Sequence, residues 1–593
     1  MQDSTVWDNS HIFTSLDDKA IAEVIESAKS DIENMAELVS QFNENQSAEV
    51  VQDLIKLRHE SVVELSTVAT YLSSITSVDA KNEQALKMQS QLGMIWTEMF
   101  KTLKPVDTFV MTCSEEIIKE ILSDEEVKEG EFGIRHSRVN KDFTLSKEEE
   151  SLLSGFKSHG IDAWGKLYNA ISGTMECNIN GEVVGYATAA SNLRGNDADL
   201  RKASWRAIQE SWIMHEKSAA AILNAINGWR NEDMKTRSVK AGRELHALDV
   251  AAHSARITRN TLDSLIQTTF KNRVVGQRAL TAMAKSRGQD KADPWDLLAA
   301  PPAKESASAG YSFKEGMDMV IAAFNSFSPE MGEFAKMMWD KNWIDAKPTP
   351  SRKPGAYCTK FSKQREPRVF MTYTGSMGDI MTLAHELGHA YHNWVMKDMH
   401  LSKTSYPMTL AETASIFAET LVRDYLYDNA KTADEKFEIC WEDASSAEAM
   451  LCNIPARYEF EKGLVEKRAK GELSANDLRD LMGDAWKTWY DDSLSEYDTM
   501  FWASKLHFSI SGLSFYNYPY LFGYLFSLGI YAQKEKMGDK FVEMYKGILR
   551  DTGSMTAEEL ISKHLGKDIE QSEFWQDSLD MVEKAISRFE ELV

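Results

Sequence analysis

The sequence predicts a mainly α-helical chain with more than one lobe. Apolar residues recur at three- and four-residue spacing over long stretches, as in KAIAEVIESAKSDIENMAELVSQF (residues 19–42). The chain has only 12 prolines in 593 residues, which favours long uninterrupted helices. A chain of this length also exceeds the size at which a single hydrophobic core stops growing. We therefore expect helices packed in at least two lobes.

The elements follow in order along the chain. Helical periodicity runs from about residue 17 to 122, and it resumes from about residue 197. Between them, ECNINGEVVGY (176–186) has two short strand-like runs on either side of Asn180-Gly181, a strong signal for a two-residue hairpin turn. We therefore predict an N-terminal helical lobe over residues 1–190 that ends in a β-hairpin, and a second domain over residues 191–593.

A less regular tract is expected from about residue 287 to 375. Its segments DPWDLLAAPPAKESASAG (293–310) and AKPTPSRKPGAYC (346–358) are rich in Pro, Gly, Ala and Ser and resemble loops. PRVFMTY (367–373) has the β-branched and aromatic residues of a short strand. Ser376 and Asp379 then have the spacing of a capping box, so a helix is predicted to begin near Met377.

Charge and cysteine content exclude some classes of protein. The formal net charge of −24 disfavours general binding to nucleic acid or to anionic membranes. The five cysteines are scattered without CxxC spacing, so neither a disulfide framework nor a structural zinc cluster is expected. The N-terminus lacks the basic start and apolar run of a secretory signal, and YLFGYLFSLGIYA (520–532) is too short to span a bilayer. A cytoplasmic location is expected.

The segment TLAHELGHAYHNW (382–394) contains the spacing H-E-x-x-H in His385, Glu386 and His389. Two histidines four residues apart share one face of a helix, so both imidazoles can reach one metal ion. The neighbouring Glu386 can then take a proton from water whose pKa a zinc ion lowers to about 7. His392 would point away from this face, which favours a structural role.

Catalytic zinc usually takes three protein ligands, so a third must lie downstream. Glu412, 23 residues after His389, lies early in a predicted helix over 409–426 and would complete a His₂Glu site. Glu419 lies two turns further along the same face. Either it orients a ligand histidine or it has a surface or structural role.

A second group of polar residues lies in FWASKLHFSISGLSFYNYPYLFGYLFSLGIY (501–531). Pro519 can open a helix that carries Tyr520 and Tyr524 on one face, with Tyr516 near them. Their hydroxyls and His507 could donate hydrogen bonds to an oxyanion or hold a peptide backbone. An aromatic stripe at this spacing is also typical of a hydrophobic core, so both interpretations stay open on these residues alone.

Five segments in order carry a family resemblance: GAYC (355–358), PRVFMTY, LAHELGHAYH (383–392), AETAS (411–415) and HF…FYNYPYLFGYLFS (507–527). Together they resemble oligoendopeptidase F, within the thimet-oligopeptidase-like family of zinc metallopeptidases. The resemblance implies a mainly α, two-lobed fold around a deep substrate channel, with a small β-sheet near the zinc site. In that fold, residues 368–373 resemble the strand at the cleft edge that pairs with an extended peptide. The implied substrates are short unfolded peptides.

The resemblance also implies roles for individual residues. One zinc ion per chain would be held by His385, His389 and Glu412, with Ser415 completing the E-x-x-S motif. Glu386 would be the general base. Further catalytic residues would be His507, Tyr516 and Tyr524, and substrate-binding residues would be Tyr520, Gly355 and Tyr357. Which tyrosine, Tyr518 included, lies over the zinc is left open.

Two alternatives to an endopeptidase remain. An exo-acting metallopeptidase would trim one or two residues from peptide ends and would need a pocket for a terminal carboxylate or amine. A non-catalytic peptide-binding protein could keep the zinc site as a structural feature, although the intact Glu386 disfavours it. The sequence does not distinguish a monomer from a dimer.

Overall fold

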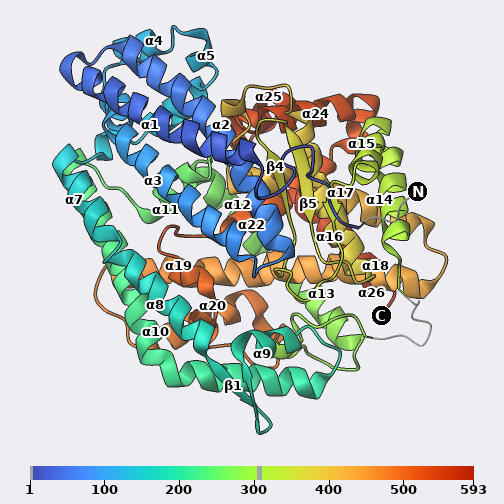
Figure 1. Cartoon of the computed structure of the whole chain (residues 1–593). Helices are drawn as coiled ribbons and strands as arrows, with labels where there is room; N and C mark the ends of the chain where they lie inside the picture. The colour runs from blue at the N-terminus through green and yellow to red at the C-terminus, as the bar shows by residue number, and fades with distance from the viewer. Residues whose placement is uncertain (1–4, 303–309) are drawn as a thin grey trace.

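Helices dominate the computed structural model, which describes residues 5–302 and 310–593 (Figure 1). The described strands form only a two-stranded and a three-stranded sheet. The mainly α prediction is therefore confirmed.

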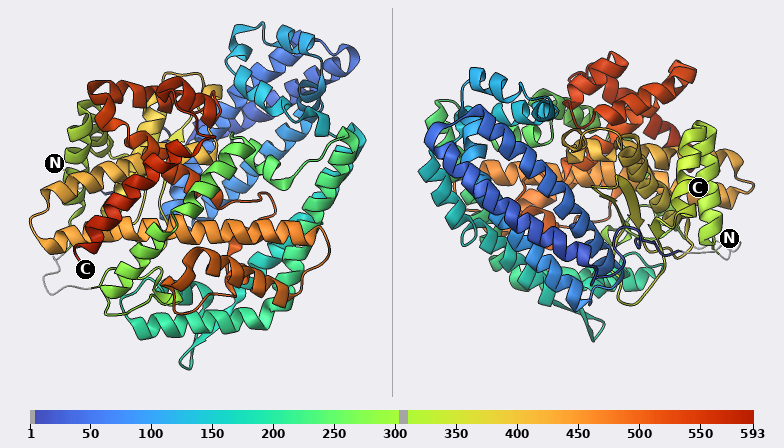
Figure 2. Two further views of the ribbon diagram at one scale, coloured as in Figure 1. Left: turned by 180° about the vertical axis from the view of Figure 1, so that it is seen from behind. Right: turned by 45° about the horizontal axis from the view of Figure 1, so that its top comes forward.

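The N-terminal helices lie side by side as a group (Figures 1 and 2). The three long ones are α1 (Lys19–Asn45), α2 (Ala48–Val78) and α3 (Glu83–Thr112), and they confirm the helical pattern predicted up to residue 122. Their shared core includes Met35 and Met99. The chain continues through short helices: α4 (Glu115–Ile121), α5 (Glu125–Lys128), α6 (Glu131–Arg138), η1 (Lys141–Phe143), α7 (Lys147–Lys157) and α8 (Ile161–Thr174).

The predicted hairpin is present as β1 (Glu176–Ile179) and β2 (Glu182–Gly185). Asn180 and Gly181 form its turn with φ of 54° and 94°, the left-handed conformation that these two residue types tolerate best. After the hairpin come α9 (Tyr186–Asn192) and the long α10 (Ala198–Ala241).

Apolar packing is continuous across residue 190. Tyr168, which precedes the hairpin, stacks on Trp212 of α10 at 5.3 Å between ring centroids. Both residues belong to a core that extends as far as Phe508. The division into domains at residue 190 stays a prediction.

The second half of the chain builds the larger core, which extends from Ala247 to Phe589. The helices after residue 246 are α11 (Ala247–Ser254), α12 (Arg259–Lys271), α13 (Val274–Lys285), α14 (Phe313–Phe327), α15 (Pro329–Asp340), α16 (Met377–Val395), α17 (Met408–Asn429), α18 (Ala433–Glu448), α19 (Ile454–Arg468), α20 (Ala475–Tyr490), α21 (Phe501–Ser504), α22 (Tyr518–Tyr531), α23 (Lys534–Met537), α24 (Phe541–Asp551), α25 (Ala557–Leu565) and α26 (Ser572–Glu590). Of these, α20 and α21 pack into the core that contains Trp212. Of the described helices, none is both long and apolar enough to cross a membrane.

The prediction of an irregular tract over residues 287–375 was wrong in its middle. Helix α14 begins at a capping box formed by Ser312 and Glu315, and it buries Met317, Val320 and Phe324 at helical spacing. Helix α15 follows with Pro329 in its first turn. The flanking Pro- and Gly-rich segments concealed this local pattern. Residues 303–309 of the predicted loop lie outside the described residues.

The three-stranded sheet lies against the helix predicted to begin at Met377, and its strand order is β3–β5–β4. The strands are β3 (Ile344–Asp345), β4 (Tyr357–Phe361) and β5 (Glu366–Phe370). The strand predicted at 367–373 therefore exists, but the prediction that it forms the edge was wrong. Strand β5 is the middle strand, parallel to β3 and antiparallel to β4, and β4 is an outer strand.

Candidate active site

Helix α16 carries the H-E-x-x-H residues and begins where the sequence predicted. Ser376 accepts a hydrogen bond from the Asp379 N–H, and the Asp379 carboxylate accepts from the Ser376 N–H, which completes the capping box. The Asp379 carboxylate also accepts from the N–H groups of Thr374 and Gly375. These bonds fix the residue at which the helix begins. They therefore fix the positions of His385 and His389 along the helix axis.

Two glycines allow the helices around the site to approach closely. A Cβ at Gly388 of α16 would lie 2.5 Å from the Ala414 carbonyl oxygen and 2.7 Å from the Ser415 Cα. A Cβ at Gly523 of α22 would lie 2.7 Å from the Glu412 Cβ. Helix α17 is thus held against α16 on one side and against α22 on the other, because neither neighbour has a side chain at the crossing point.

We expect Gly388→Ala to lower both stability and metal affinity. The added methyl meets backbone atoms of α17, which can relieve the overlap only by moving away, at a cost of about 1–3 kcal/mol. That movement separates Glu412 from the two histidines. Thermal unfolding and competition with a metal chelator measure the two effects. Gly378→Ala on the same helix is the matched control, since its nearest atom would be 3.6 Å away; equal effects of the two substitutions contradict this account.

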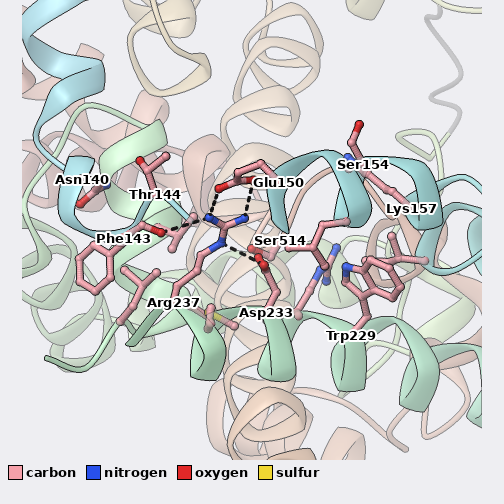
Figure 3. Close-up of a pocket in the computed structure, with 18 of the residues that line it drawn as sticks. Asn140, Phe143, Thr144, Glu150, Ser154, Lys157, Trp229, Asp233, Arg237 and Ser514 are labelled. Atoms are coloured by element: carbon pink, nitrogen blue, oxygen red, sulfur yellow. Dashed lines mark hydrogen bonds and ion pairs between the residues drawn. The ribbon is translucent and has the colours of Figure 1, made fainter. Parts of the chain in front are cut away.

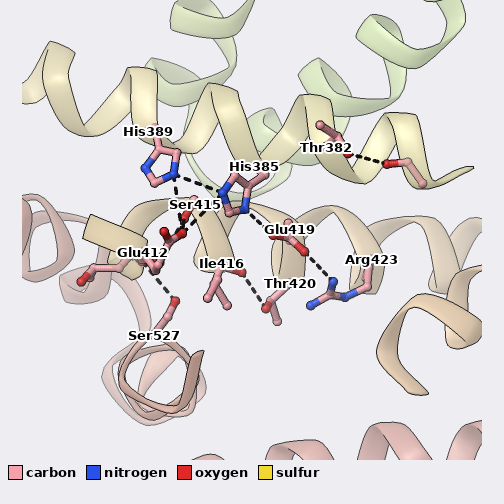
Figure 4. A network of polar contacts seen from close by, with 12 residues as sticks. Thr382, His385, His389, Glu412, Ser415, Ile416, Glu419, Thr420, Arg423 and Ser527 are labelled. Atoms are coloured by element: carbon pink, nitrogen blue, oxygen red, sulfur yellow. Dashed lines mark hydrogen bonds and ion pairs between the residues drawn. The ribbon is translucent and has the colours of Figure 1, made fainter. Parts of the chain in front are cut away.

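The three predicted metal ligands come together at the crossing of α16 and α17 (Figure 4). The His385 Nε2 and His389 Nε2 atoms are 3.1 Å apart. The Glu412 Oε2 atom lies 3.4 Å from His385 Nε2 and 3.5 Å from His389 Nε2. A tetrahedral ion with ligands at about 2.0–2.2 Å requires spacings of about 3.3–3.6 Å between those ligands. Both Glu412 spacings fall in this range and the spacing between the histidines is slightly shorter, so the donor set is close to the geometry that one zinc-sized ion requires.

Neighbouring hydroxyl and carboxylate groups orient two of these ligands. The Ser415 hydroxyl donates to Glu412 Oε2 at 2.7 Å. On the other side, His385 Nδ1 lies 2.6 Å from Glu419 Oε1. This contact fixes the ring so that Nε2 faces Glu412 and His389. Of the two roles left open for Glu419, the orienting carboxylate agrees with this contact.

A buried ion pair extends this contact away from the metal site. Arg423 donates to Glu419 Oε2 at 2.9 Å, and its Nε lies 2.8 Å from Asp443 Oδ1 on α18. Burial opposes ionisation of Glu419, but its contacts with His385 and Arg423 lower its pKa overall. Glu419 is therefore a carboxylate held between two cation-forming side chains.

The two histidines are in unequal electrostatic environments. Burial lowers the pKa of His389 to about 4, and the neighbouring His385 acts in the same direction. Burial also acts against a charged His385, but the hydrogen bond and charge of Glu419, together with Glu412, raise its pKa to about 9. Binding of a metal ion must therefore displace a proton from His385.

Glu386 lies on α16 next to His385 but is not one of the three predicted metal ligands. Its side chain is buried, and its Oε2 has no hydrogen-bond partner among the described residues. Burial raises the pKa of Glu386 to about 7. A buried carboxylate with a free oxygen is costly in a purely structural role, and its pKa is suited to exchanging protons near neutral pH.

His392 points away from the metal site, as the sequence indicated. Its Nε2 donates to the Leu549 carbonyl oxygen at 3.0 Å and contacts the Thr552 hydroxyl at 2.9 Å. Its ring stacks on Tyr406 at 4.2 Å. His392 therefore joins α16 to α24.

We expect His392 to make the fold sensitive to acid. Burial lowers its pKa to about 3, whereas the unfolded value is about 6.5. Because the unfolded chain binds the proton more tightly, this contribution to stability is complete above about pH 6.5 and is lost as the pH falls toward 3. Between pH 7.5 and 5.0 the wild type should lose about 2 kcal/mol more than His392→Asn. Denaturant unfolding at both pH values tests this, and equal losses contradict it.

Three residues of the second predicted group come together. The His507 and Tyr516 rings meet edge to face at 4.9 Å, and the Tyr520 hydroxyl donates to the Tyr516 hydroxyl at 3.0 Å. His507 Nδ1 lies 2.7 Å from Asn517 Oδ1, and the Arg457 guanidinium contacts both of these atoms at 3.3 Å. Helix α22 begins with Pro519 in its first turn, as predicted, so Tyr520 lies at the end of α22 nearest His507.

Tyr524 is separated from this group. It is buried one turn beyond Tyr520, past Gly523, where it lies near Arg423 and Asp443 and lines a different cavity with them. Tyr518, the other tyrosine left open, is also buried and donates to the Ala251 carbonyl oxygen at 3.0 Å. Of the four tyrosines, Tyr516 and Tyr520 are the two with partly exposed side chains.

The GAYC residues lie where strand β4 begins. Gly355 has φ of 96°, and no atom lies within 4 Å of the position of a Cβ there. The Tyr357 hydroxyl contacts the Ser77 hydroxyl of α2 at 2.8 Å, and its ring stacks on Phe370. Tyr357 thus joins the sheet to the N-terminal helices, while Gly355 leaves open space beside the backbone.

Strand β4 runs next to the metal-site helix. The Asn393 side chain donates to the His389 carbonyl oxygen at 3.1 Å and contacts Cys358 Sγ at 3.8 Å. The N–H groups of Val369 and Met371 bond to residues 343 and 345, on the β3 side of the sheet. By alternation, Tyr357 and Thr359 bond to β5, and the backbone groups of Cys358 face the outer side of β4. The outer edge of β4 at Cys358 therefore lies beside Asn393, which is one helical turn after His389 on α16.

Sequence reasoning missed four polar residues of this region: Arg423, Asp443, Arg457 and Asn517. Arg423 could have been found by extending the helical face of Glu412 and Glu419 by one more turn. Asn517 stands among the tyrosines in FYNYPY. Asp443 and Arg457 are on other helices, and nothing local in the sequence connects them with the site.

An H-E-x-x-H helix packed against a helix that supplies a glutamate, within a helical fold, defines a helical metallopeptidase. Comparison with known proteins identifies the family. Residues 193–581 match the model of peptidase family M3, and residues 110–176 match that of "Oligopeptidase F". The first match covers well over half of the chain, and the chain therefore belongs to peptidase family M3.

Individual relatives are distant but extend over nearly the whole chain. "Oligopeptidase PepF" of Bacillus subtilis (strain 168) is 21% identical, with 99% of this chain and 87% of the relative covered. "Oligoendopeptidase F homolog" of Lactococcus lactis subsp. lactis (strain IL1403) is 20% identical, with coverage of 88% and 87%.

Two crystal structures show the same fold. That of a proposed peptidase from Chlamydophila abortus has a TM-score of 0.82 at 19% identity, with 100% of this chain and 99% of that chain covered. That of oligoendopeptidase-F from Enterococcus faecium has a TM-score of 0.70 at 17% identity, with coverage of 96% and 98%.

Proposed function

We propose that the chain is a zinc-dependent endopeptidase that hydrolyses internal bonds of short, unfolded oligopeptides. The observation that carries this proposal is the convergence of three donor atoms at 3.1–3.5 Å beside the buried, partly unpaired carboxylate of Glu386. The names of the relatives, oligopeptidase and oligoendopeptidase F, support the same substrate class.

His385, His389 and Glu412 would hold the zinc ion. When bound, zinc supplies a Lewis acid that polarises the scissile carbonyl and lowers the pKa of water. Glu386 takes the proton of the attacking water on a carboxylate oxygen and then delivers it to the nitrogen of the leaving amine. Glu419 keeps the Nδ1 side of His385 engaged throughout, so that the imidazole does not rotate.

The charge that develops on the substrate oxygen needs hydrogen-bond donors nearby. Tyr516, Tyr520 and His507 are proposed for this role because they form one contact group with partly exposed side chains. Tyr524 is not part of this group. It lies beside the Arg423–Asp443 ion pair instead. The sequence-based role of Tyr524 at the oxyanion is therefore not part of this proposal.

An extended peptide would pair with the outer edge of β4, in place of the β5 edge that the sequence suggested. The backbone groups of Cys358 face that edge, and Gly355 leaves space for a second chain to approach. Tyr357, which is bonded to Ser77, would hold the start of the strand in place. Backbone pairing of this kind selects unfolded peptides, because a folded protein does not expose an extended segment.

The five cysteines are all free thiols, which agrees with a reducing compartment and supports the proposed cytoplasmic location. The oligomeric state is not part of the proposal.

Mass spectrometry of a defined peptide mixture tests the proposed function. We expect hydrolysis at bonds far from both termini, loss of hydrolysis with a metal chelator, and recovery with Zn²⁺. Products shortened by only one or two residues would instead indicate the exo-acting alternative. Peptide binding without any hydrolysis by the Zn²⁺-loaded protein would indicate the non-catalytic alternative.

A further inference from the structure

A cavity of about 680 Å³ lies between the N-terminal helices and the second half of the chain (Figure 3). None of the three metal ligands is among its lining residues. Its walls come from α3, α7, α10 and the loop of residues 511–514. Part of its lining is apolar: Met111, Leu153, Ile161, Trp229, Val250 and Leu513. It is large enough to take several side chains of a peptide.

The loop of residues 511–514 connects this cavity to the proposed substrate-contacting residues. His507 precedes the loop and Tyr516 follows it, and Ser514 is at most about 7 Å of extended chain from Tyr516. Arg230 of α10 fixes the loop by donating to the carbonyl oxygens of Ile510 and Leu513. A peptide that passes Tyr516 on this side therefore reaches the cavity within a few residues.

Each acidic side chain that lines the cavity pairs with an arginine. Asp107 pairs with Arg58 at 2.8 Å. Glu150 and Asp233 both pair with Arg237, at 2.6 Å and 2.9 Å, and Figure 3 shows Arg237 held between them. Because Glu150 and Asp233 share Arg237, that group keeps one net negative charge, and the nearby charge of Lys104 also acts on Glu150.

The cations that line the cavity differ from the carboxylates in their ion-pair contacts. Among residues 5–302 and 310–593, no ion pair joins Lys104, Lys157 or Arg230 to a carboxylate. Arg230 donates to backbone carbonyl groups, and burial lowers its pKa. The charge of Glu461 acts on Arg230 in the opposite direction; Glu461 is buried and accepts from the Phe515 N–H at 2.6 Å. Of the described residues, four cations and three carboxylates line the cavity, so its lining has a net positive charge in a chain whose net charge is −24.

We propose that this cavity is a distal subsite that binds a carboxylate of the peptide substrate. The carboxylate comes either from the C-terminus of the peptide or from an Asp or Glu side chain, and the apolar wall receives the neighbouring residues. Lys104 and Lys157 pair with the carboxylate at the mouth of the cavity. This inference rests on the proposed peptidase function and adds a substrate preference to it.

Binding of fluorescent peptides to the Glu386→Gln protein tests the proposal without depending on turnover. One peptide sequence is made with a C-terminal carboxylate or a C-terminal amide, and a second pair carries Asp or Asn near the end. Anisotropy titrations should give about tenfold tighter binding for the acidic member of one pair. The pair that differs identifies the source of the carboxylate. Equal affinities within both pairs overturn the proposal.

The double variant Lys104→Gln/Lys157→Gln should remove this preference while leaving the affinity for the uncharged peptide unchanged. Lys87→Gln/Lys470→Gln is the matched control, because it changes the net charge equally at exposed positions outside the cavity. A preference that survives in the first variant, or that is lost equally in the control, overturns the subsite. Failure of the peptidase function is seen separately, as no chelator-sensitive hydrolysis of any peptide by the wild type.

Discussion

Glu386→Gln is expected to lower kcat/KM for peptide hydrolysis by about 10²–10⁴-fold while leaving the metal bound. Glutamine keeps the size and one hydrogen-bonding oxygen of the side chain but cannot accept a proton from water. The metal ligands are three other side chains, so their geometry does not depend on this carboxylate. Steady-state kinetics with a quenched peptide, together with metal analysis of the purified variant, measures both quantities.

The pH profile gives a second measurement of the same role. Since burial raises the pKa of Glu386 to about 7, a base with that pKa loses activity as the pH falls through that region, because the protonated carboxyl can no longer accept a proton. Full activity of Glu386→Gln would falsify the mechanism. Loss of metal together with activity would show that Glu386 has a structural role.

The second large effect is expected at the buried contacts behind His385. Glu419→Gln should weaken metal binding by about 10–100-fold, because the amide no longer fixes the imidazole by charge. Asp443→Asn should weaken it in the same direction by a smaller factor, because Arg423 then loses one of its two carboxylate partners. Chelator competition gives the metal affinity of each variant without reference to activity.

A second buried pair separates this effect from a general loss of stability. Arg201 donates two hydrogen bonds to Asp296, and both side chains are almost fully buried, but α10 and the segment of residues 294–296 are far in sequence from the metal ligands. Asp296→Asn should therefore lower the unfolding temperature at least as much as Asp443→Asn. Its metal affinity should stay at the wild-type value. A parallel loss of metal affinity in both variants would mean that Asp443 acts only through stability.

Local signals in the sequence were sufficient for much of the fold and for the metal site. The capping box at Ser376 fixed the start of α16, and Asn180-Gly181 fixed the hairpin turn. The spacing within H-E-x-x-H follows from helical geometry. Glu412 could be predicted because it lies early in the next predicted helix and matches the E-x-x-S motif of the family that the sequence resembles.

Features that depend on packing between distant segments could not be predicted in this way. Strand β3 has two residues, too few for any periodic pattern, so the place of β5 in the middle of the sheet was hidden. Tyr520 and Tyr524 share a helix face in the sequence, but α22 crosses α17 at Gly523, between them. That crossing places one tyrosine near His507 and the other near Arg423.

Strand β4 contacts both the N-terminal helices and the metal-site helix α16. Its Phe361 side chain lies in the core of the N-terminal helices, while Cys358, three residues earlier, contacts the metal-site helix through Asn393. Thr70 of α2 also donates to the Lys360 carbonyl oxygen at 3.2 Å.

The strand proposed to pair with the peptide is therefore fastened to α2 at its two ends, through Tyr357 at the start and through Lys360 and Phe361 at the end. Any swinging of the N-terminal helices away from α16 must carry β4 with them or break these bonds. The strand edge proposed to bind the peptide would then move relative to the metal ligands. Binding of a peptide and movement of the N-terminal helices toward α16 would therefore be coupled.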